Sequence, residues 1–200
     1  MFLIIIISLV VINIGFIVVL IVNPKLTASV GGKVLVFIAF FILPVMTIVF
    51  STTLQYNNSK TMEFCLSCHI MKPYGQSLLI DDNRYIPAYH YQNNLIPQDD
   101  ACFTCHTTYT LFGDIKAKLR GLGHFFNYYF GGKYENIKLR LPFNNRECLH
   151  CHGESRSFLE GELHNPIMDK LRNNEQSCLH CHGPFHSVES LDKFKFWKKE

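Results

Sequence analysis

The clearest pattern along the chain is an apolar first quarter followed by a polar remainder. Residues Phe2 to Val22 carry no charge and only two polar interruptions, Ser8 and Asn13. Because about 20 apolar residues cross the hydrocarbon core as a helix, this run predicts a transmembrane helix. A cleaved signal peptide is the alternative, but such peptides begin with basic residues and have a shorter apolar run.

A second apolar run extends from Val34 to Phe50 and can continue to about Leu54. Pro44 lies inside it, and a proline can kink a membrane helix without ending it. The run is slightly short for a span, so a buried core helix is the alternative. We favour a second transmembrane helix, since the polar remainder offers no sizeable core for such a helix to enter.

The connection between the two runs, Asn23–Lys33, carries two lysines and no acidic residue. Short cationic loops stay on the cytoplasmic side, which places the N-terminus and the later residues on the outer side. We therefore predict a membrane anchor over 1–55 and an extracytoplasmic domain over 56–200, held at the cytoplasmic (inner) membrane. The formal net charge of +3 is too small and too scattered to indicate binding to nucleic acid.

All eight cysteines occur in pairs, and each pair is followed directly by a histidine. The four motifs are Cys65-Leu66-Ser67-Cys68-His69, Cys102-Phe103-Thr104-Cys105-His106, Cys148-Leu149-His150-Cys151-His152 and Cys178-Leu179-His180-Cys181-His182. C-x-x-C-H attaches c-type haem, because two thiols on one turn reach both vinyl groups and the histidine reaches the iron. Zinc sites need two cysteine pairs per ion, and disulfides would not explain the histidines. The sequence predicts four covalently attached haem c groups.

Histidines outside the four motif ends are sufficient to supply second axial ligands. His150 and His180 lie inside motifs and point away from their own iron. The remaining four match the four irons in number: His90, His124, His164 and His186. Met71, two residues after His69, is a further candidate, because a thioether ligand raises the haem potential. Methionine also fills gaps beside apolar groups, and the spacing leaves both roles open for Met71.

The fold class that follows is mostly α with irregular loops. We expect two N-terminal transmembrane helices plus a small multihaem cytochrome c domain whose core is largely porphyrin, with little or no sheet. The first two motifs begin 37 residues apart and the last two 30 apart, and both later motifs read C-L-H-C-H-G. This repeat suggests two haem pairs built on related plans.

These features resemble the NapC/NirT family of membrane-bound tetrahaem quinol dehydrogenases. The segments that carry the resemblance are Cys65–Met71, His90–Asn93, Cys102–His106 with a lysine-containing helix to His124, and Cys178–His182 with His186 beyond it. The resemblance implies oxidation of menaquinol or ubiquinol at the membrane surface. It also implies transfer of the electrons to a periplasmic reductase or a multihaem cytochrome in anaerobic-type respiration.

The resemblance also implies roles for single residues. Met71 would be the axial ligand of the first haem, with His69 displaced, and the quinol pocket would lie beside that haem. An acidic residue precedes the second motif in relatives, and Asp99 or Asp100 is placed to be it; Asp99 is the candidate proton acceptor. Gln92, the second residue predicted to act on quinol, stands where relatives have a lysine in the His-Tyr-Lys-Asn segment. Relatives also usually have one membrane helix instead of two.

Two other functions are compatible with the residues. One is an electron-relay subunit without its own quinol site, and the other is a terminal reductase with an open haem position. The four spare histidines argue against the reductase. A homo-oligomer is compatible with the sequence. The basic and aromatic residues from Lys193 to Lys199 predict a solvated or lipid-contacting tail.

Overall fold

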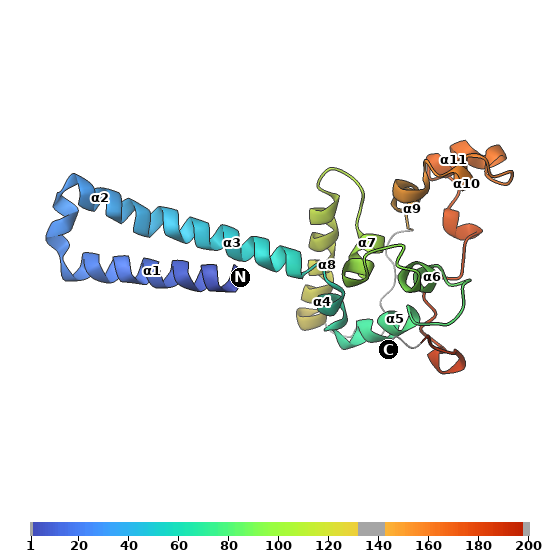
Figure 1. The fold of residues 1–200 in the computed structure, drawn as a ribbon, viewed down its shortest axis with the longest axis horizontal. Helices are drawn as coiled ribbons and strands as arrows, with labels where there is room; N and C mark the ends of the chain where they lie inside the picture. Colours follow the sequence, from blue (N-terminus) through green and yellow to red (C-terminus); the bar gives the residue numbers. More distant parts are fainter. Residues whose placement is uncertain (1, 132–142, 198–200) are drawn as a thin grey trace. The chain divides into compact units, whose positions relative to one another are not determined.

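The computed structural model describes residues 2–131 and 143–197; the side chains at positions 2, 124, 125, 127 and 128 are outside the description. The chain divides into two compact units, Met1–Lys60 and Thr61–Glu200. Figure 1 shows the elements of both. The predicted boundary lay five residues earlier, after residue 55.

The first unit consists of two long apolar helical segments joined by a tight turn. Helix α1 (Phe2–Val22) is followed by the 3₁₀ turn η1 (Pro24–Ala28), and α1 packs against α3 (Leu43–Asn58). The second segment is continuous from Val30 to Asn58, through α2 (Val30–Phe37), η2 (Ile38–Ile42) and α3. Both segments are long and apolar enough to cross a membrane, as the hydrophobic pattern predicted.

Pro44 explains an irregularity inside the second segment. A proline has no N–H group, and its ring clashes with the carbonyl four residues before it. The five residues of η2, directly upstream, form a π-helix in which the Leu43 N–H group donates to the Ile38 carbonyl. This wider turn carries the chain past the proline, so the helix continues beyond it.

The turn between the two segments requires a glycine at one position. A Cβ atom on Gly32 would lie 1.6 Å from the Leu26 carbonyl oxygen, so any other residue would push η1 away from α2. Ser29 begins α2 and its hydroxyl accepts from the Gly32 N–H group at 3.0 Å. The turn η1 therefore packs closely against the first residues of α2.

The second unit is built from short helices and irregular connections. Its helices are α4 (Met62–Leu66), η3 (His69–Met71), α5 (Lys72–Ser77), α6 (Ile86–Gln92), η4 (Gln98–Asp100), α7 (Ala101–His106), α8 (Gly113–Phe130), α9 (Asn145–His152), α10 (Arg156–Leu159), η5 (Asn165–Ile167), α11 (Met168–Arg172), η6 (Cys178–His180) and η7 (Leu191–Lys193). Within 2–131 and 143–197 the only strand-like pairing is an isolated bridge between Ile80 and Phe196. The predicted mostly α fold class is confirmed.

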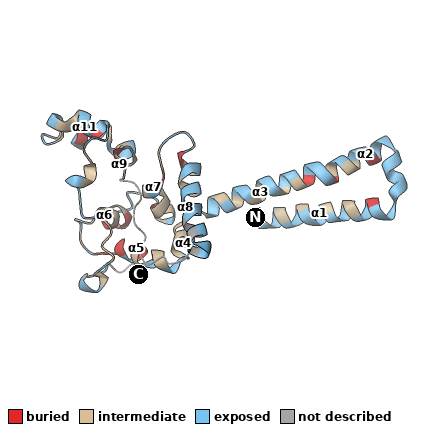
Figure 2. Ribbon diagram, turned by 180° about the vertical axis from the view of Figure 1, so that it is seen from behind, coloured by how far each residue is buried: buried red, intermediate tan, exposed pale blue. Residues whose placement is uncertain are grey.

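The apolar core of the second unit is small, as its composition predicted. One cluster joins Leu78, Tyr91 and Ala101, with Met62 and Ile96 packed against it. Figure 2 shows the buried residues as scattered patches among exposed and half-exposed ribbon. The described part of this unit thus buries few apolar side chains of its own.

The C-terminal segment is attached to the unit by its backbone. The Asp81 N–H group donates to the Lys195 carbonyl at 2.9 Å, and the Trp197 N–H group donates to the Leu79 carbonyl at 2.7 Å. The Phe194 ring meets Tyr85 edge to face, with ring centroids 5.3 Å apart. Residues 194–197 are therefore attached to the unit although Lys195 and Phe196 stay exposed, and contact of this tail with solvent or lipid stays a prediction; positions 198–200 lie outside the described residues.

Candidate haem-binding sites

Three of the four cysteine motifs begin at a side-chain helix cap. Thr61 caps α4, Asn144 caps α9 and Ser177 caps η6, each through a hydrogen bond from a backbone N–H group. A capping oxygen satisfies an N–H group that the first helical turn leaves without a partner. The short helices thus start at fixed residues; α4 and η6 carry the first cysteine of their motifs, and α9 carries both cysteines of the third. The second motif lies in α7, which follows η4 directly.

The first cysteines of neighbouring motifs lie beside each other in pairs, Cys65 with Cys102 and Cys148 with Cys178. The contact between the Cys65 and Cys102 side chains lowers the pKa of the Cys65 thiol to about 7 and raises the pKa of the Cys102 thiol. In the same way, the contact between the Cys148 and Cys178 side chains lowers the pKa of the Cys178 thiol to about 7 and raises the pKa of the Cys148 thiol. The first motif therefore lies against the second, and the third against the fourth.

Three motif histidines each face one histidine from elsewhere in the chain. The ring centroids of His90 and His152 are 5.9 Å apart, and those of His106 and His186 are 6.2 Å apart. The rings of His164 and His182 are 6.0 Å apart. Sequence reasoning named all six residues but left the pairing open.

These separations fit a haem iron between the two rings. Two imidazoles on one metal place their centroids about 6 Å apart, because each metal–nitrogen bond is about 2 Å and each centroid lies about 1 Å beyond the nitrogen. A porphyrin supplies the other four ligands, so two imidazoles complete the iron. By contrast, no group of three or more His, Cys, Asp or Glu side chains in the described part of the chain could hold a metal ion alone. The residues present therefore suit haem better than zinc.

Hydrogen bonds at Nδ1 direct the other nitrogen of the three partner histidines. His90 Nδ1 lies 2.9 Å from the Ile86 carbonyl, and His164 Nδ1 lies 3.2 Å from the Phe158 carbonyl. A carbonyl only accepts, so both rings carry their proton on Nδ1 and present Nε2 as a ligand. A hydrogen bond to the far nitrogen is the usual way in which a protein fixes and tunes a metal-binding imidazole.

His186 has the same arrangement through a serine. The buried Ser77 hydroxyl donates to the Tyr74 carbonyl at 2.6 Å, so its oxygen accepts from His186 Nδ1, also at 2.6 Å. Burial, and then the nearby His106, lowers the pKa of His186 to about 4. The ring is thus neutral, the form that can bind a metal.

The second and third motifs are joined through Tyr109. Its ring stacks on His150 with centroids 3.8 Å apart, and its backbone N–H group donates to Glu147 at 2.9 Å. The phenol in turn donates to the Thr104 carbonyl in α7 at 2.9 Å. His150, which the sequence predicted to face away from its own iron, therefore packs against the neighbouring motif.

The third and fourth motifs share a buried side chain, Asn145, which is 1% exposed. Its Nδ2 group donates to the carbonyls of Leu171 at 2.8 Å and Gln176 at 2.6 Å. Its Oδ1 atom accepts from the Cys178 N–H group at 2.8 Å. One amide at the start of α9 thereby fixes the segment that carries the fourth motif.

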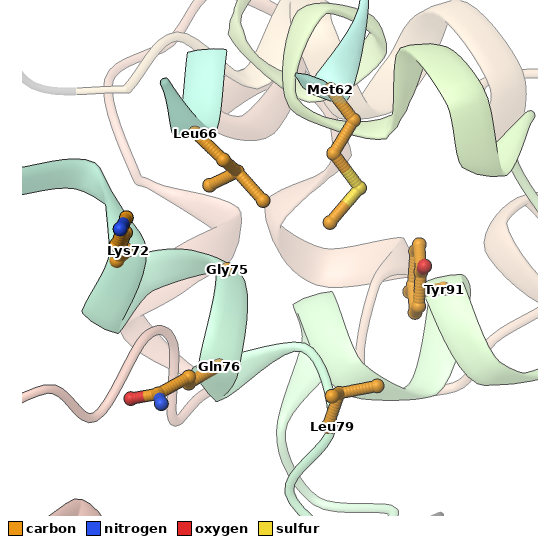
Figure 3. Close-up of a pocket in the computed structure, with 7 residues that line it drawn as sticks. All are labelled: Met62, Leu66, Lys72, Gly75, Gln76, Leu79 and Tyr91. Carbon is orange, nitrogen blue, oxygen red and sulfur yellow. The ribbon is translucent and has the colours of Figure 1, made fainter. Parts of the chain in front are cut away.

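The first motif lies beside an apolar hollow of about 320 Å³. Seven residues line it: Met62, Leu66, Lys72, Gly75, Gln76, Leu79 and Tyr91. Figure 3 shows Lys72 and Gln76 on one side of the hollow and Tyr91 on the other. His69 and Met71 belong to η3, directly before α5; His69 is exposed and Met71 half-buried.

The two residues predicted to act on quinol are placed near the hollow without lining it. Gln92 donates through Nε2 to the carbonyls of Leu78 at 3.0 Å and Ile80 at 2.8 Å, so its amide nitrogen holds the chain after α5. Asp99 is exposed and lines a second, open hollow of about 540 Å³ with residues 94–98. Burial, and then the charge of Asp99, raises the pKa of the Tyr91 phenol.

Some residues of these sites were not predicted from the sequence, and the side chain of one predicted ligand lies outside the described part of the structure. Sequence reasoning missed Tyr91, Lys72 and Gln76, although Tyr91 directly follows the predicted ligand His90. It also missed Ser77, for which no local signal exists because its partner lies 109 residues away. The side chain of the predicted ligand His124 lies outside the described residues, although its backbone belongs to α8.

Comparison with known proteins gives one match. A family profile described as "NapC/NirT cytochrome c family, N-terminal region" matches residues 23–189. Searches of curated proteins and of solved structures gave no significant match. Since the profile covers most of the chain, the protein belongs to the NapC/NirT cytochrome c family, and is a membrane-anchored cytochrome c that carries c-type haem and transfers electrons to redox partners.

Proposed function

We propose that this chain binds four haem c groups, oxidises quinol, and relays the electrons to a periplasmic reductase or multihaem cytochrome. The haem unit would lie on the extracytoplasmic side of the cytoplasmic membrane, as the lysines of the 23–33 connection favour. The observation that carries the proposal is the apolar hollow beside the first motif. Menaquinol and ubiquinol are both apolar substrates whose polar groups are confined to one ring.

The proposed ligands follow from the ring pairs. The cysteines of each motif would form thioethers, and the axial pairs would be His106 with His186, His152 with His90, and His182 with His164. For the first haem we propose Met71, on the strength of the family resemblance and its half-buried position next to the hollow. When bound, haem c supplies one-electron oxidation and reduction.

The hollow suits a quinol head group in size and chemistry. Its volume of about 320 Å³ is at the lower end of the range typical of small-molecule sites. Met62, Leu66 and Leu79 provide apolar contact, and Lys72, Gln76 and the Tyr91 phenol provide polar groups on opposite sides. These polar groups would hold the two ring oxygens of the quinol and fix its orientation.

Quinol oxidation releases two protons and two electrons, and the protons need a route to solvent. A phenol keeps its proton at neutral pH, and burial raises the pKa of Tyr91 further, so its hydroxyl can hydrogen-bond to a quinol oxygen. Asp99, whose charge acts on Tyr91, is exposed and would pass the protons to the outer aqueous side. Gln92 would support the site by holding the chain that ends in Leu79 and Ile80.

The contacts between motifs support an order for the relay. The first motif touches the second through Cys65 and Cys102, and Tyr109 joins the second motif to the third. The third touches the fourth through Cys148 and Cys178. Electrons that enter beside the first motif would therefore pass along the motifs in sequence order and leave from the fourth.

Anaerobic stopped-flow mixing of the purified full-length cytochrome with a menaquinol analogue tests the proposal. Rapid haem reduction that a quinol-site inhibitor blocks, and that Tyr91→Phe slows, is the expected result. A matched control is Tyr89→Phe, because Tyr89 is exposed and lies outside the hollow. No reduction by quinol, with normal reduction by dithionite, would refute the proposal and establish a relay that depends on a partner for its electrons.

A further inference from the structure

Helix α8 carries an exposed apolar stripe. Ile115, Leu119, Leu122, Phe126 and Phe130 recur at intervals of three or four residues, which places them on one side of the helix. Each is between 47% and 78% exposed. Figure 2 shows α8 largely in the colour of exposed residues. An apolar surface of this kind marks a site of contact with a partner or a membrane.

The side chains by which α8 contacts the rest of the second unit include Asp114 and Lys118, which are not part of the apolar stripe. Asp114 accepts from the Thr107 hydroxyl at 2.8 Å, and the Lys118 ammonium lies 4.6 Å from the centroid of the Phe103 ring. Both contacts reach back to α7 and its flank. They fix α8 on the unit while the apolar stripe stays exposed.

The polar residues of α8 indicate the chemistry of the partner. Over Gly113–Phe130 there are three basic residues, Lys116, Lys118 and Arg120, and one acidic residue, Asp114. Asp114 is already bonded to Thr107, whereas Lys116 and Arg120 are exposed. An apolar stripe flanked by exposed basic residues is the pattern of a helix that lies in an anionic lipid surface.

A second copy of the chain fits less well. Two α8 stripes packed together would bring the basic flanks of both helices close, and like charges beside such a seam oppose pairing. A bilayer is present wherever this protein is, because the chain is membrane-anchored. We propose that α8 docks in the lipid–water interface, with its apolar stripe among the acyl chains and Lys116 and Arg120 at anionic headgroups.

The test uses the full-length cytochrome with its haems attached, reconstituted in vesicles with a photoreactive lipid. The lipid carries a diazirine near the headgroup end of an acyl chain, and labelled peptides are mapped by mass spectrometry. Vesicles of phosphatidylcholine alone are compared with vesicles that also contain phosphatidylglycerol. We expect labelling of the 113–130 peptide, and more of it when phosphatidylglycerol is present.

Three variants separate the contributions. Leu119→Glu should reduce labelling in both kinds of vesicle, because it places a charge in the apolar stripe. Lys116→Glu together with Arg120→Glu should abolish the gain from phosphatidylglycerol, each lost positive charge accounting for about five-fold in binding. Leu163→Glu is the matched control, since Leu163 is 85% exposed and far from α8 in sequence; it should change nothing. Haem absorbance spectra verify that every variant is folded.

Two results would overturn the proposal. One is the absence of label on α8 in both kinds of vesicle while the 2–22 and 30–58 segments are labelled, which would mean that the stripe meets no lipid. The other is α8-to-α8 crosslinking between copies in place of lipid labelling, which would identify a second chain as the partner.

Discussion

Replacing Asn145 by aspartate should loosen the part of the chain that carries the fourth motif. The change keeps the oxygen that accepts from Cys178 but turns the two amide N–H donors into a carboxylate oxygen. The carbonyls of Leu171 and Gln176 would then lose their donor and face a negative charge. Leaving a buried polar group unsatisfied costs about 1–3 kcal/mol, so the pair costs about 2–6 kcal/mol.

Hydrogen exchange measures this loss where it occurs. At pH 7 the amides of residues 171–182 should exchange at least about 30-fold faster in Asn145→Asp than in the parent protein, because 2 kcal/mol of local stability corresponds to that ratio. Burial raises the pKa of the new carboxyl, and its neutral form regains one donor. The defect should therefore be larger at pH 7 than at pH 4.

Asn173→Asp is the matched control, because Asn173 is an exposed residue at the end of α11. It adds the same charge without removing the three bonds of Asn145. If Asn145→Asp and Asn173→Asp exchanged at the same rate over residues 171–182, Asn145 would not hold this segment and the reasoning would be wrong.

Three further predictions concern the histidines, the hollow and an exposed ion pair. Ser77→Ala should raise the midpoint potential of one haem, because His186 loses the hydrogen bond that makes its ring a more electron-donating ligand. Spectroelectrochemistry measures the shift. Unchanged potentials would contradict the pairing of Ser77 with a haem-binding His186. Gly75→Val should raise KM for quinol while reduction by dithionite stays normal. Even a Cβ atom added at Gly75 would lie 2.7 Å from the Leu66 side chain and push it into the hollow. An unchanged KM would place the quinol elsewhere. Arg84 lowers the pKa of Asp82 to about 2 through its hydrogen bonds, so the ion pair can stabilise the fold above about pH 4 and stops doing so as the pH falls through about 2. Any destabilisation by Arg84→Ala should therefore be seen above about pH 4 and vanish near pH 2. Urea midpoints across this range test it, and a destabilisation that persists at pH 2 would exclude the pair as its cause.

The sequence predicted the features that depend on neighbouring residues. Apolar length predicted both candidate membrane helices, and the motif Cys-x-x-Cys-His predicted haem attachment without any knowledge of the fold. The repeat spacing suggested two haem pairs built on related plans, which stays a prediction; Cys65 lies beside Cys102, and Cys148 beside Cys178. Each of these inferences needs only a periodicity or a fixed local spacing.

The features that sequence reasoning missed depend on distant contacts. His186 follows the fourth motif by four residues, yet it faces His106 of the second, because Ser77 and Tyr74 hold it there. The role of Gln92 in quinol oxidation stays a prediction, and the two backbone carbonyls that accept from its amide nitrogen, those of Leu78 and Ile80, were not foreseen. No local pattern indicates which of several separated segments will meet.

The attachment of residues 195–197 to residues 79–81 has a consequence for assembly of the protein. A ribosome makes the chain from its N-terminus, so the second motif emerges about 80 residues before His186, the histidine that faces it. Haem attachment at the second motif can therefore precede the arrival of His186, which Ser77 and Tyr74 then hold in place. Loss of the bonds made by residues 195–197 would accordingly loosen residues 79–81, which lie close in sequence to the Ser77 that holds His186 against the second motif.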